Sequence, residues 1–151
     1  MLRKVSRPVE EITPRICTLI DDMIDTMRDA EGCGLAAVQV GVLRRICVIE
    51  VEDGKVYELI NPKIIAFAGE QEEREGCLSN PGSYGVTKRP RAVTVRATDR
   101  HGNEYELNGT DLLARAICHE CDHLDGKLYT DVQIREVTDE ELRRESRSRR
   151  R

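Results

Sequence analysis

The sequence predicts an α+β fold in which short antiparallel β-sheets surround a central helix and an N-terminal amphipathic helix packs outside them. Three observations lead to this prediction. Apolar residues near the N-terminus recur every three or four positions, as on one face of a helix. The middle of the chain contains short segments rich in β-branched residues, separated by turn residues. A second helical pattern, near the C-terminal end, is apolar over more than half of its circumference and should be largely buried.

The first helix is expected from about Thr13 to Glu31. Thr13 is a residue type that caps helices with its side-chain oxygen, and Pro14 suits the first helical position. Gly32 is expected to end the helix, as glycine commonly does. The apolar stripe consists of Ile16, Leu19, Ile20, Met23, Ile24 and Met27. We assign this stripe to the core rather than to a binding surface.

Five β-strands are expected between the two helices, each rich in β-branched residues. They span Arg45–Val51, Val56–Ile60, Lys63–Ala68, Ala92–Ala97 and Glu104–Leu107. The sequences Asp53-Gly54 and His101-Gly102-Asn103 are typical of hairpin turns. Hairpins join antiparallel strands, so the sheets should be antiparallel.

The second helix is expected from Asp111 to Leu124, with Gly126 stopping it. It carries the sequence His119-Glu120-Cys121-Asp122-His123, a match to the motif HExxH. Residues four apart lie one above the other on a helix, so both imidazoles can reach one metal ion. Glu120 is rotated by about 100° from His119 and is placed to act as a base.

A metal site on this helix needs a third protein ligand and an open position. The chain after His123 contains no His or Cys, and before the basic tail it offers only a few carboxylates, such as Glu136. Cys118 and Cys121 form a Cys-x-x-Cys pair, but helical geometry turns Cys118 away from the histidine face. Cys77 is the better candidate, because it ends a strand between a glycine and a Pro-Gly turn. A thiolate and two neutral imidazoles suit a divalent ion.

Composition and length bound the remaining possibilities. The 151 residues correspond to one domain, and we expect a catalytic domain over 1–135 and a charged, flexible tail over 136–151. No apolar run reaches the roughly 20 residues of a membrane span, and no signal peptide is recognisable, so a soluble cytoplasmic protein without a membrane partner is expected. Six cysteines without an export signal indicate a reducing compartment. Five aromatic residues argue against stacking platforms for single-stranded nucleic acid.

The last nine residues, Arg143–Arg151, contain six Arg and one Glu and carry a charge of +5, although the whole chain carries −4. Such a block cannot bury apolar surface. It is either a solvated end without a partner or a contact for a polyanion such as RNA.

A glycine-rich segment, residues 32–39 (GCGLAAVQ), follows the first helix. Its glycines and alanines make a slim, extended strand against which a substrate backbone can lie, and Gln39 offers amide N–H donors to a developing oxyanion. Taken alone, the segment is equally well explained as a tight connection between a helix and a strand. It lacks the Lys-Ser/Thr ending of a phosphate loop.

Three segments together resemble the peptide deformylase family, whose motifs are G-x-G-φ-A-A-x-Q, E-G-C-φ-S and H-E-x-x-H in this order. The chain matches them as GCGLAAVQ (32–39), EGCLS (75–79) and HECDH (119–123). The resemblance implies removal of the formyl group from the N-terminal formyl-methionine of nascent chains. It also implies one divalent metal ion, most commonly Fe²⁺, which Zn²⁺, Ni²⁺ or Co²⁺ can replace.

The resemblance also implies roles for individual residues. Glu120 looks like the general acid and base, and the Gln39 side chain and the Leu78 backbone N–H would hold the oxyanion. The expected metal ligands are Cys77, His119 and His123. The expected substrate contacts are Cys33, Gly34 and Glu75. Glu75 should also pair with Arg89 behind the site, and the methionine side chain would enter an apolar pocket near the second helix.

Two alternative functions share part of this pattern. A metallopeptidase would use HExxH without needing Cys77 or Gln39, and a comparison of formylated with free N-terminal peptides would identify it. A metal-stabilised or nucleic-acid-binding domain would leave Glu120 idle and use the basic tail, and its RNA affinity would depend on salt. For a deformylase, we hypothesise that the tail contacts the ribosome.

Overall fold

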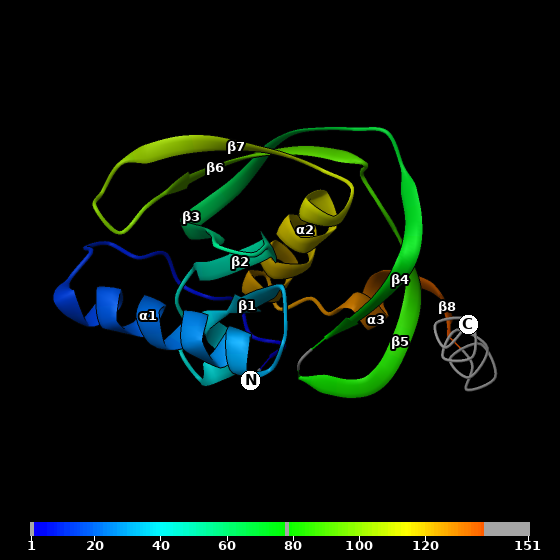
Figure 1. Cartoon of the computed structure of the whole chain (residues 1–151), viewed down its shortest axis with the longest axis horizontal. Helices are drawn as coiled ribbons and strands as arrows, with labels where there is room; N and C mark the ends of the chain where they lie inside the picture. Colours follow the sequence, from blue (N-terminus) through cyan, green and yellow to red (C-terminus); the bar gives the residue numbers. More distant parts are fainter. Residues whose placement is uncertain (1, 78, 138–151) are drawn as a thin grey trace.

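The computed structural model places two antiparallel sheets around one helix, which confirms the predicted α+β class (Figure 1). Strands pair in the order β1-β2-β3-β6-β7 in one sheet and β4-β5-β8 in the other. Helix α2 contacts strands of both sheets. The structure describes residues 2–77 and 79–137, with the backbone alone for 80–83, 132 and 134–136.

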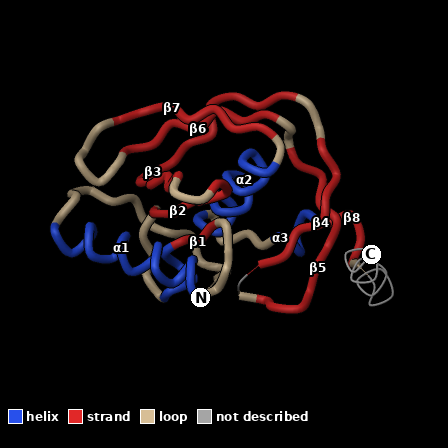
Figure 2. The backbone as a smooth tube through the Cα atoms, in the orientation of Figure 1, coloured by secondary structure: helices blue, strands red, loops and turns tan. Residues whose placement is uncertain are grey.

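Most of the strands lie between the first and the last helices, as Figure 2 shows. The helices are α1 (Pro14–Asp29), the 3₁₀ turn η1 (Ala37–Val40), α2 (Leu112–Leu124) and α3 (Tyr129–Val132). The strands are β1 (Gly34–Ala36), β2 (Ile46–Glu52), β3 (Lys55–Ala68), β4 (Gln71–Cys77), β5 (Asn80–Arg89), β6 (Ala92–Thr98), β7 (Glu104–Thr110) and β8 (Gln133–Glu136). Within the described ranges, no helix combines the length and apolar character that a membrane span requires.

Helix α1 begins as predicted but ends differently. Its N-cap is Thr13, whose Oγ1 accepts a hydrogen bond from the Ile16 N–H at 3.3 Å, and Pro14 is the first helical residue. At the C-terminus the left-handed residue is Glu31, with φ of 56°, and not Gly32. The Gly32 N–H still bonds to the Met27 carbonyl at 2.9 Å, which closes the last turn of the helix.

Strand β2 is buried on both faces and connects the two parts of the core. Cys47 and Ile49 belong to the cluster that packs against α2. Ile46 and Val48 point the other way, into the cluster formed with Ile20, Met23 and Met27 of α1. Alternate side chains of a strand point to opposite faces. Helix α1 therefore packs on the outside of the sheet, as predicted.

Strand β3 replaces two predicted strands. Val56–Ile60 and Lys63–Ala68 are parts of one strand, whose register with β6 shifts between Ile60 and Lys63. Asn61 lies at this irregularity with φ of 51°. Its side-chain amide forms two hydrogen bonds with the backbone of Val9, at 2.8 and 2.9 Å, which offset the strained conformation. Both predicted hairpin turns are present, between β2 and β3 and between β6 and β7.

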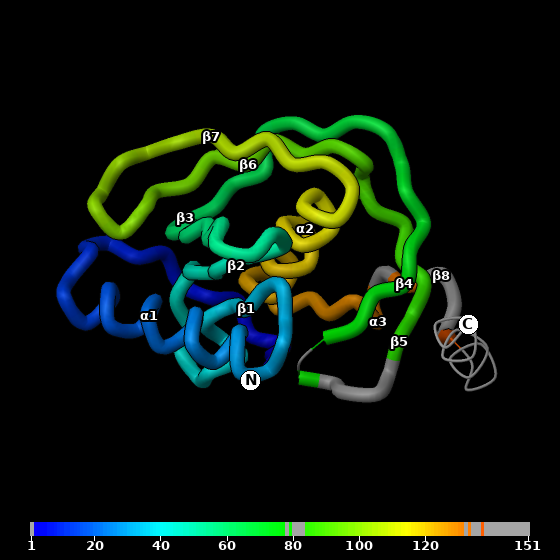
Figure 3. The backbone as a smooth tube through the Cα atoms, in the orientation of Figure 1, coloured from blue at the N-terminus to red at the C-terminus, as the bar shows by residue number. Residues whose placement is uncertain are grey.

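The chain after α2 returns to the smaller sheet. Gly126 follows the helix with φ of 75°, and a Cβ there would lie 2.4 Å from the Arg3 carbonyl oxygen, so only glycine fits. Strand β8 then pairs with β5, which is about fifty residues earlier in the chain (Figure 3). Most of the predicted tail, 136–151, lies outside the described residues, and its boundary stays a prediction.

Candidate metal centre

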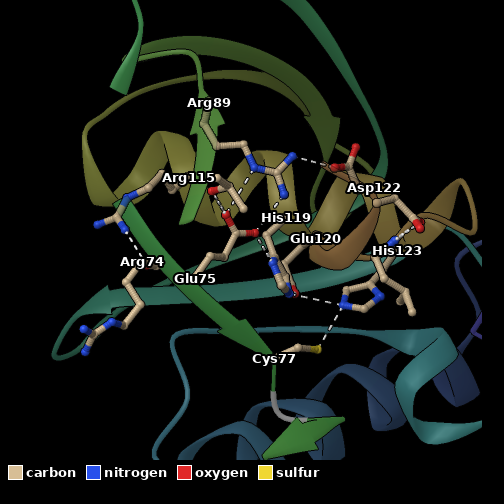
Figure 4. Close-up of polar contacts among 12 residues, drawn as sticks. Arg74, Glu75, Cys77, Arg89, Arg115, His119, Glu120, Asp122 and His123 are labelled. Carbon is tan, nitrogen blue, oxygen red and sulfur yellow. Dashed lines mark hydrogen bonds and ion pairs between the residues drawn. The ribbon is translucent and has the colours of Figure 1, made fainter. Parts of the chain in front are cut away.

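Three side chains from two elements converge at one point, where two of them are half-buried and the third is buried (Figure 4). Cys77 is the last residue of β4, and His119 and His123 lie one turn apart on α2. The Nε2 atom of His123 is 3.2 Å from the Cys77 Sγ and 3.2 Å from the His119 Nε2. All three ligand atoms lie within 4.8 Å of one another. The structure therefore brings together the three residues that the motifs predicted as metal ligands.

This donor set fits a divalent cation. The Nε2 atoms of His119 and His123 face each other at 3.2 Å, so the lone pairs of the two rings can be directed at one ion. Two imidazoles and a thiolate form a ligand set that transition metals and zinc prefer. Within 2–77 and 79–137, no other cluster of three His, Cys, Asp or Glu side chains has ligand atoms close enough to hold an ion.

The carboxylate of Glu75 orients His119 from behind. Its Oε1 accepts hydrogen bonds from the His119 Nδ1 and, at 2.7 Å, from the Arg89 Nη2. Its Oε2 accepts from the Thr87 hydroxyl at 2.6 Å and from the Arg89 Nε at 3.2 Å. Arg89 also donates to Asp122 of α2 at 2.5 Å. The expected pairing of Glu75 with Arg89 is present, and a proton on His119 Nδ1 leaves its Nε2 free to bind a metal.

Opposing effects set the pKa values of the buried groups. Burial acts to raise the pKa of Glu75, but hydrogen bonds from His119 and Arg89 lower it to about 2. Burial acts to lower the pKa of His119, but hydrogen bonds to Cys77 and Glu75 raise it to about 11. Burial and the charge of His119 lower the pKa of His123 to about 4. Glu75 is therefore ionised, and it favours positive charge in the centre of the cluster.

Glu120 lies beside the cluster and is almost completely buried. Its side chain is 2% exposed, and its Oε1 is 3.8 Å from the His119 Nε2. Its Oε2 is buried and has no hydrogen-bond partner in the described part of the chain. A Cβ at Gly34 would lie 3.0 Å from the Glu120 Cγ, so the glycine lets β1 approach this carboxyl group. Burial raises the pKa of Glu120 to about 7.

Gln39 aims its amide group at the same cluster. Its Oε1 accepts a hydrogen bond from the Ala36 N–H at 2.9 Å, which fixes the side chain over the turn η1. Its Nε2 donates to the Cys77 Sγ at 3.4 Å and to the Ser79 hydroxyl at 3.0 Å. Residues 34–36 form the expected extended strand, but 37–40 form a 3₁₀ turn instead of continuing it. Leu78, the other predicted oxyanion contact, lies outside the described residues.

A pocket of about 590 Å³ opens onto these groups. The predicted site residues that line it are Cys33, Gly34, Gln39, Glu75, Cys77, His119 and Glu120. The predicted site residues His123 and Arg89 do not line the pocket. Sequence reasoning missed the lining residues Leu112, Arg115 and Ala116, although they precede His119 by seven, four and three residues, which places them on one face of α2. It also missed Arg74 and Tyr84, whose side chains lie against each other on the neighbouring strands.

The comparison with protein families is decisive for the class of protein. A family model described as Polypeptide deformylase matches residues 1–139. The chain belongs to the peptide deformylase family. Peptide deformylases remove the N-formyl group from the formyl-methionine terminus of nascent polypeptides and release formate, and this chain is a metal-dependent hydrolase of that kind. Family membership decides against the metallopeptidase and the non-enzymatic alternatives.

Peptide deformylases of several organisms are similar over nearly the full chain. The one from Lachnoclostridium phytofermentans is 55% identical over 143 residues, which cover 91% of this chain and 88% of the relative. The one from Acetivibrio thermocellus is 53% identical and covers 100% of this chain and 88% of the relative. The crystal structure of the Legionella pneumophila peptide deformylase, 41% identical, superposes with a TM-score of 0.85 over 99% of this chain and 92% of that one.

A solved complex adds a similar fold with a bound ligand. The peptide deformylase from Synechococcus elongatus in complex with actinonin is 39% identical, has a TM-score of 0.85, and covers 95% of this chain and 79% of that one.

Proposed function

We propose that Cys77, His119 and His123 hold the divalent ion of this deformylase, with Fe²⁺ as the native metal and Zn²⁺, Ni²⁺ or Co²⁺ as possible replacements. The convergence of their three ligand atoms supports this proposal. A bound ion supplies Lewis-acid chemistry, because it polarises a carbonyl group and makes water more acidic. His119 would bind the ion through a deprotonated Nε2, while its Nδ1 keeps its proton and donates it in a hydrogen bond to the Glu75 carboxylate.

Glu120 is the proposed general base and acid. Its carboxylate takes a proton from the water that attacks the formyl carbon, and it returns the proton to the amine nitrogen when the C–N bond breaks. The products are formate and a free N-terminal methionine. Its pKa of about 7 suits both steps, because a group that titrates near neutral pH can accept and donate a proton.

Gln39 and the Leu78 backbone N–H are proposed to hold the oxyanion that forms on the formyl oxygen. The Gln39 amide is already oriented by Ala36 and its nitrogen points at the cluster. Its hydrogen bond to Ser79 can be exchanged for one to the oxyanion, so no side-chain rotation is needed.

The peptide is proposed to bind as an additional strand along Cys33 and Gly34. Strand β1 is an edge of the five-stranded sheet and pairs with β2 on one side. Glu75 and Arg89 support the site, since protein donors fill the acceptor positions of the Glu75 carboxylate. The methionine side chain enters the pocket along Leu112 and Ala116 of α2.

Replacing Cys77 by serine tests the proposed ligand set. Serine keeps the size of the side chain but is not a thiolate, so metal affinity should fall by at least about tenfold. Metal content after dialysis against a weak chelator measures this loss. Cys33→Ser is the matched control, because Cys33 lines the same pocket outside the cluster. Equal metal content in Cys77→Ser and wild type would remove Cys77 from the ligand set.

We also propose that the enzyme acts in the cytoplasm, on chains emerging from ribosomes, and that its basic tail contacts the ribosome. The charge of +5 over Arg143–Arg151 suits the phosphate backbone of RNA. Deleting these nine residues should weaken co-sedimentation with ribosomes and reduce its dependence on salt, while turnover of a short formyl-Met peptide stays unchanged. Unchanged co-sedimentation would contradict the contact.

A further inference from the structure

The hydroxyl of Thr87 completes the set of donors around the Glu75 carboxylate. A carboxylate offers about four lone-pair positions, two on each oxygen. Arg89 fills one on each oxygen, and His119 fills the second on Oε1. The second on Oε2 accepts the Thr87 hydroxyl at 2.6 Å. Thr87 is thus the one hydroxyl donor among the three side chains that bind this carboxylate.

Strand β5 places Thr87 at this position through its register. Glu75 of β4 lies opposite Gly85 of β5, and Thr87 is the next residue of β5 on the same face. Arg89 follows two residues later, again on that face, so one face of β5 supplies two of the three partners of Glu75. Gly85, Thr87 and Arg89 are all buried, and Thr87 is 0% exposed. The hydroxyl cannot exchange its carboxylate partner for water.

Without this hydroxyl, Oε2 would keep one hydrogen bond, from the Arg89 Nε at 3.2 Å. Arg89 also donates a hydrogen bond to Asp122 at 2.5 Å, so its guanidinium group is shared between two carboxylates. The plane of the carboxylate would then be less well defined. The direction of the His119 Nε2 lone pair depends on that plane, because the His119 Nδ1 bonds to Oε1.

We propose that Thr87 is a positioning residue of this deformylase: it locks the Glu75 carboxylate so that His119 holds the metal in the productive orientation. The inference rests on the proposed role of His119 as a ligand. Thr87 does not line the substrate pocket, so it acts through Glu75 and not on the substrate.

The test compares three variants of the Co²⁺-loaded enzyme with the wild type. Thr87→Val keeps the shape and removes the hydroxyl, and Thr87→Ser keeps the hydroxyl. Thr94→Val is the matched control, because the Thr94 hydroxyl also donates to a side-chain oxygen, that of Asn108 at 2.7 Å, in the other sheet. Two quantities are measured: the rate of Co²⁺ transfer to a chelator, and kcat and KM for a formyl-Met peptide.

Thr87→Val should release Co²⁺ about tenfold faster than the wild type and lower kcat without changing KM, because the peptide contacts are intact. Thr87→Ser should restore both properties, and Thr94→Val should leave both unchanged. Wild-type rates in Thr87→Val, or equal acceleration in Thr94→Val, would overturn the role of Thr87. A wild type that takes up no Co²⁺ would instead overturn the metal site itself.

Discussion

Replacing Glu120 by glutamine is expected to lower kcat by about 10²- to 10⁴-fold, because the general base and acid is lost. Glutamine has the same size as glutamate and cannot take a proton from water. The metal should be retained, since the three proposed ligands are unchanged. Single-turnover assays with a formyl-Met peptide and metal analysis of the same samples measure both effects.

Glu31→Gln is the control for this substitution. Glu31 lines the same pocket but is exposed at the end of α1, so its neutral variant should keep both activity and metal. Glu120→Gln should also fold at least as stably as the wild type above pH 7, because burial of a charged carboxylate is unfavourable. Wild-type turnover in Glu120→Gln would show that another group moves the proton.

The pH profile gives a second check on Glu120. The base must be ionised to accept a proton, so kcat/KM should fall as the pH decreases through the pKa of Glu120. Burial raises that pKa to about 7, and a nearby divalent ion favours the carboxylate and lowers it. The acidic limb of the profile should therefore lie below pH 7, and it should be missing from the residual activity of Glu120→Gln.

Local patterns predicted part of the geometry of the candidate metal centre. The histidines of HExxH are four residues apart on one helix, so their convergence depends on helical periodicity alone. The position of Cys77 could not be predicted from local patterns, because the residues around it do not specify which helix or strand it contacts. The structure supplies that position through the pairing of β4 with β5, which brings the end of β4 to α2.

The smaller sheet could not be predicted in the same way. Gln71–Cys77 and the segment after it are rich in charged residues and glycine, so they lack the apolar alternation that indicates a strand. Their buried residues, such as Glu75 and Arg89, are polar because they bind each other. The proposed role of Thr87 could not be predicted from the sequence either, because it depends on the register between β4 and β5. The irregularity of β3 at Asn61 likewise depends on hydrogen bonds with Val9, which is distant in sequence.

Replacing Arg89 by alanine should have the largest effect on stability. The side chains of Arg89 and Glu75 are 6% and 8% exposed, and Arg89 also pairs with Asp122. Its loss leaves a buried carboxylate without its main counter-charge, which costs about 3–5 kcal/mol of the free energy of unfolding. Urea denaturation of the metal-free proteins at neutral pH measures this loss, since a bound metal would add its own stabilisation.

Two further variants show whether the burial of the ion pair is the cause. Arg91 lies two residues after Arg89 and forms an exposed ion pair with Asp111. Arg91→Ala removes this pair and should cost at most about 1 kcal/mol of the free energy of unfolding. Arg89→Lys should be intermediate, because an ammonium group cannot grip both oxygens of Glu75 and also reach Asp122. Equal losses in Arg89→Ala and Arg91→Ala would contradict a special role for the buried network.

The pH dependence of stability should change with Arg89 as well. Glu75 has a pKa of about 2 in the folded protein, against an ordinary value of 4.5. Between these values the unfolded chain binds more protons than the folded one, so stability rises with pH and falls as the pH drops from 4.5 toward 2. The fall amounts to about 3 kcal/mol for this group. In Arg89→Ala the pKa of Glu75 lies closer to 4.5, so unfolding measured over this range should show a shallower slope. An unchanged slope would mean that His119 alone keeps Glu75 ionised.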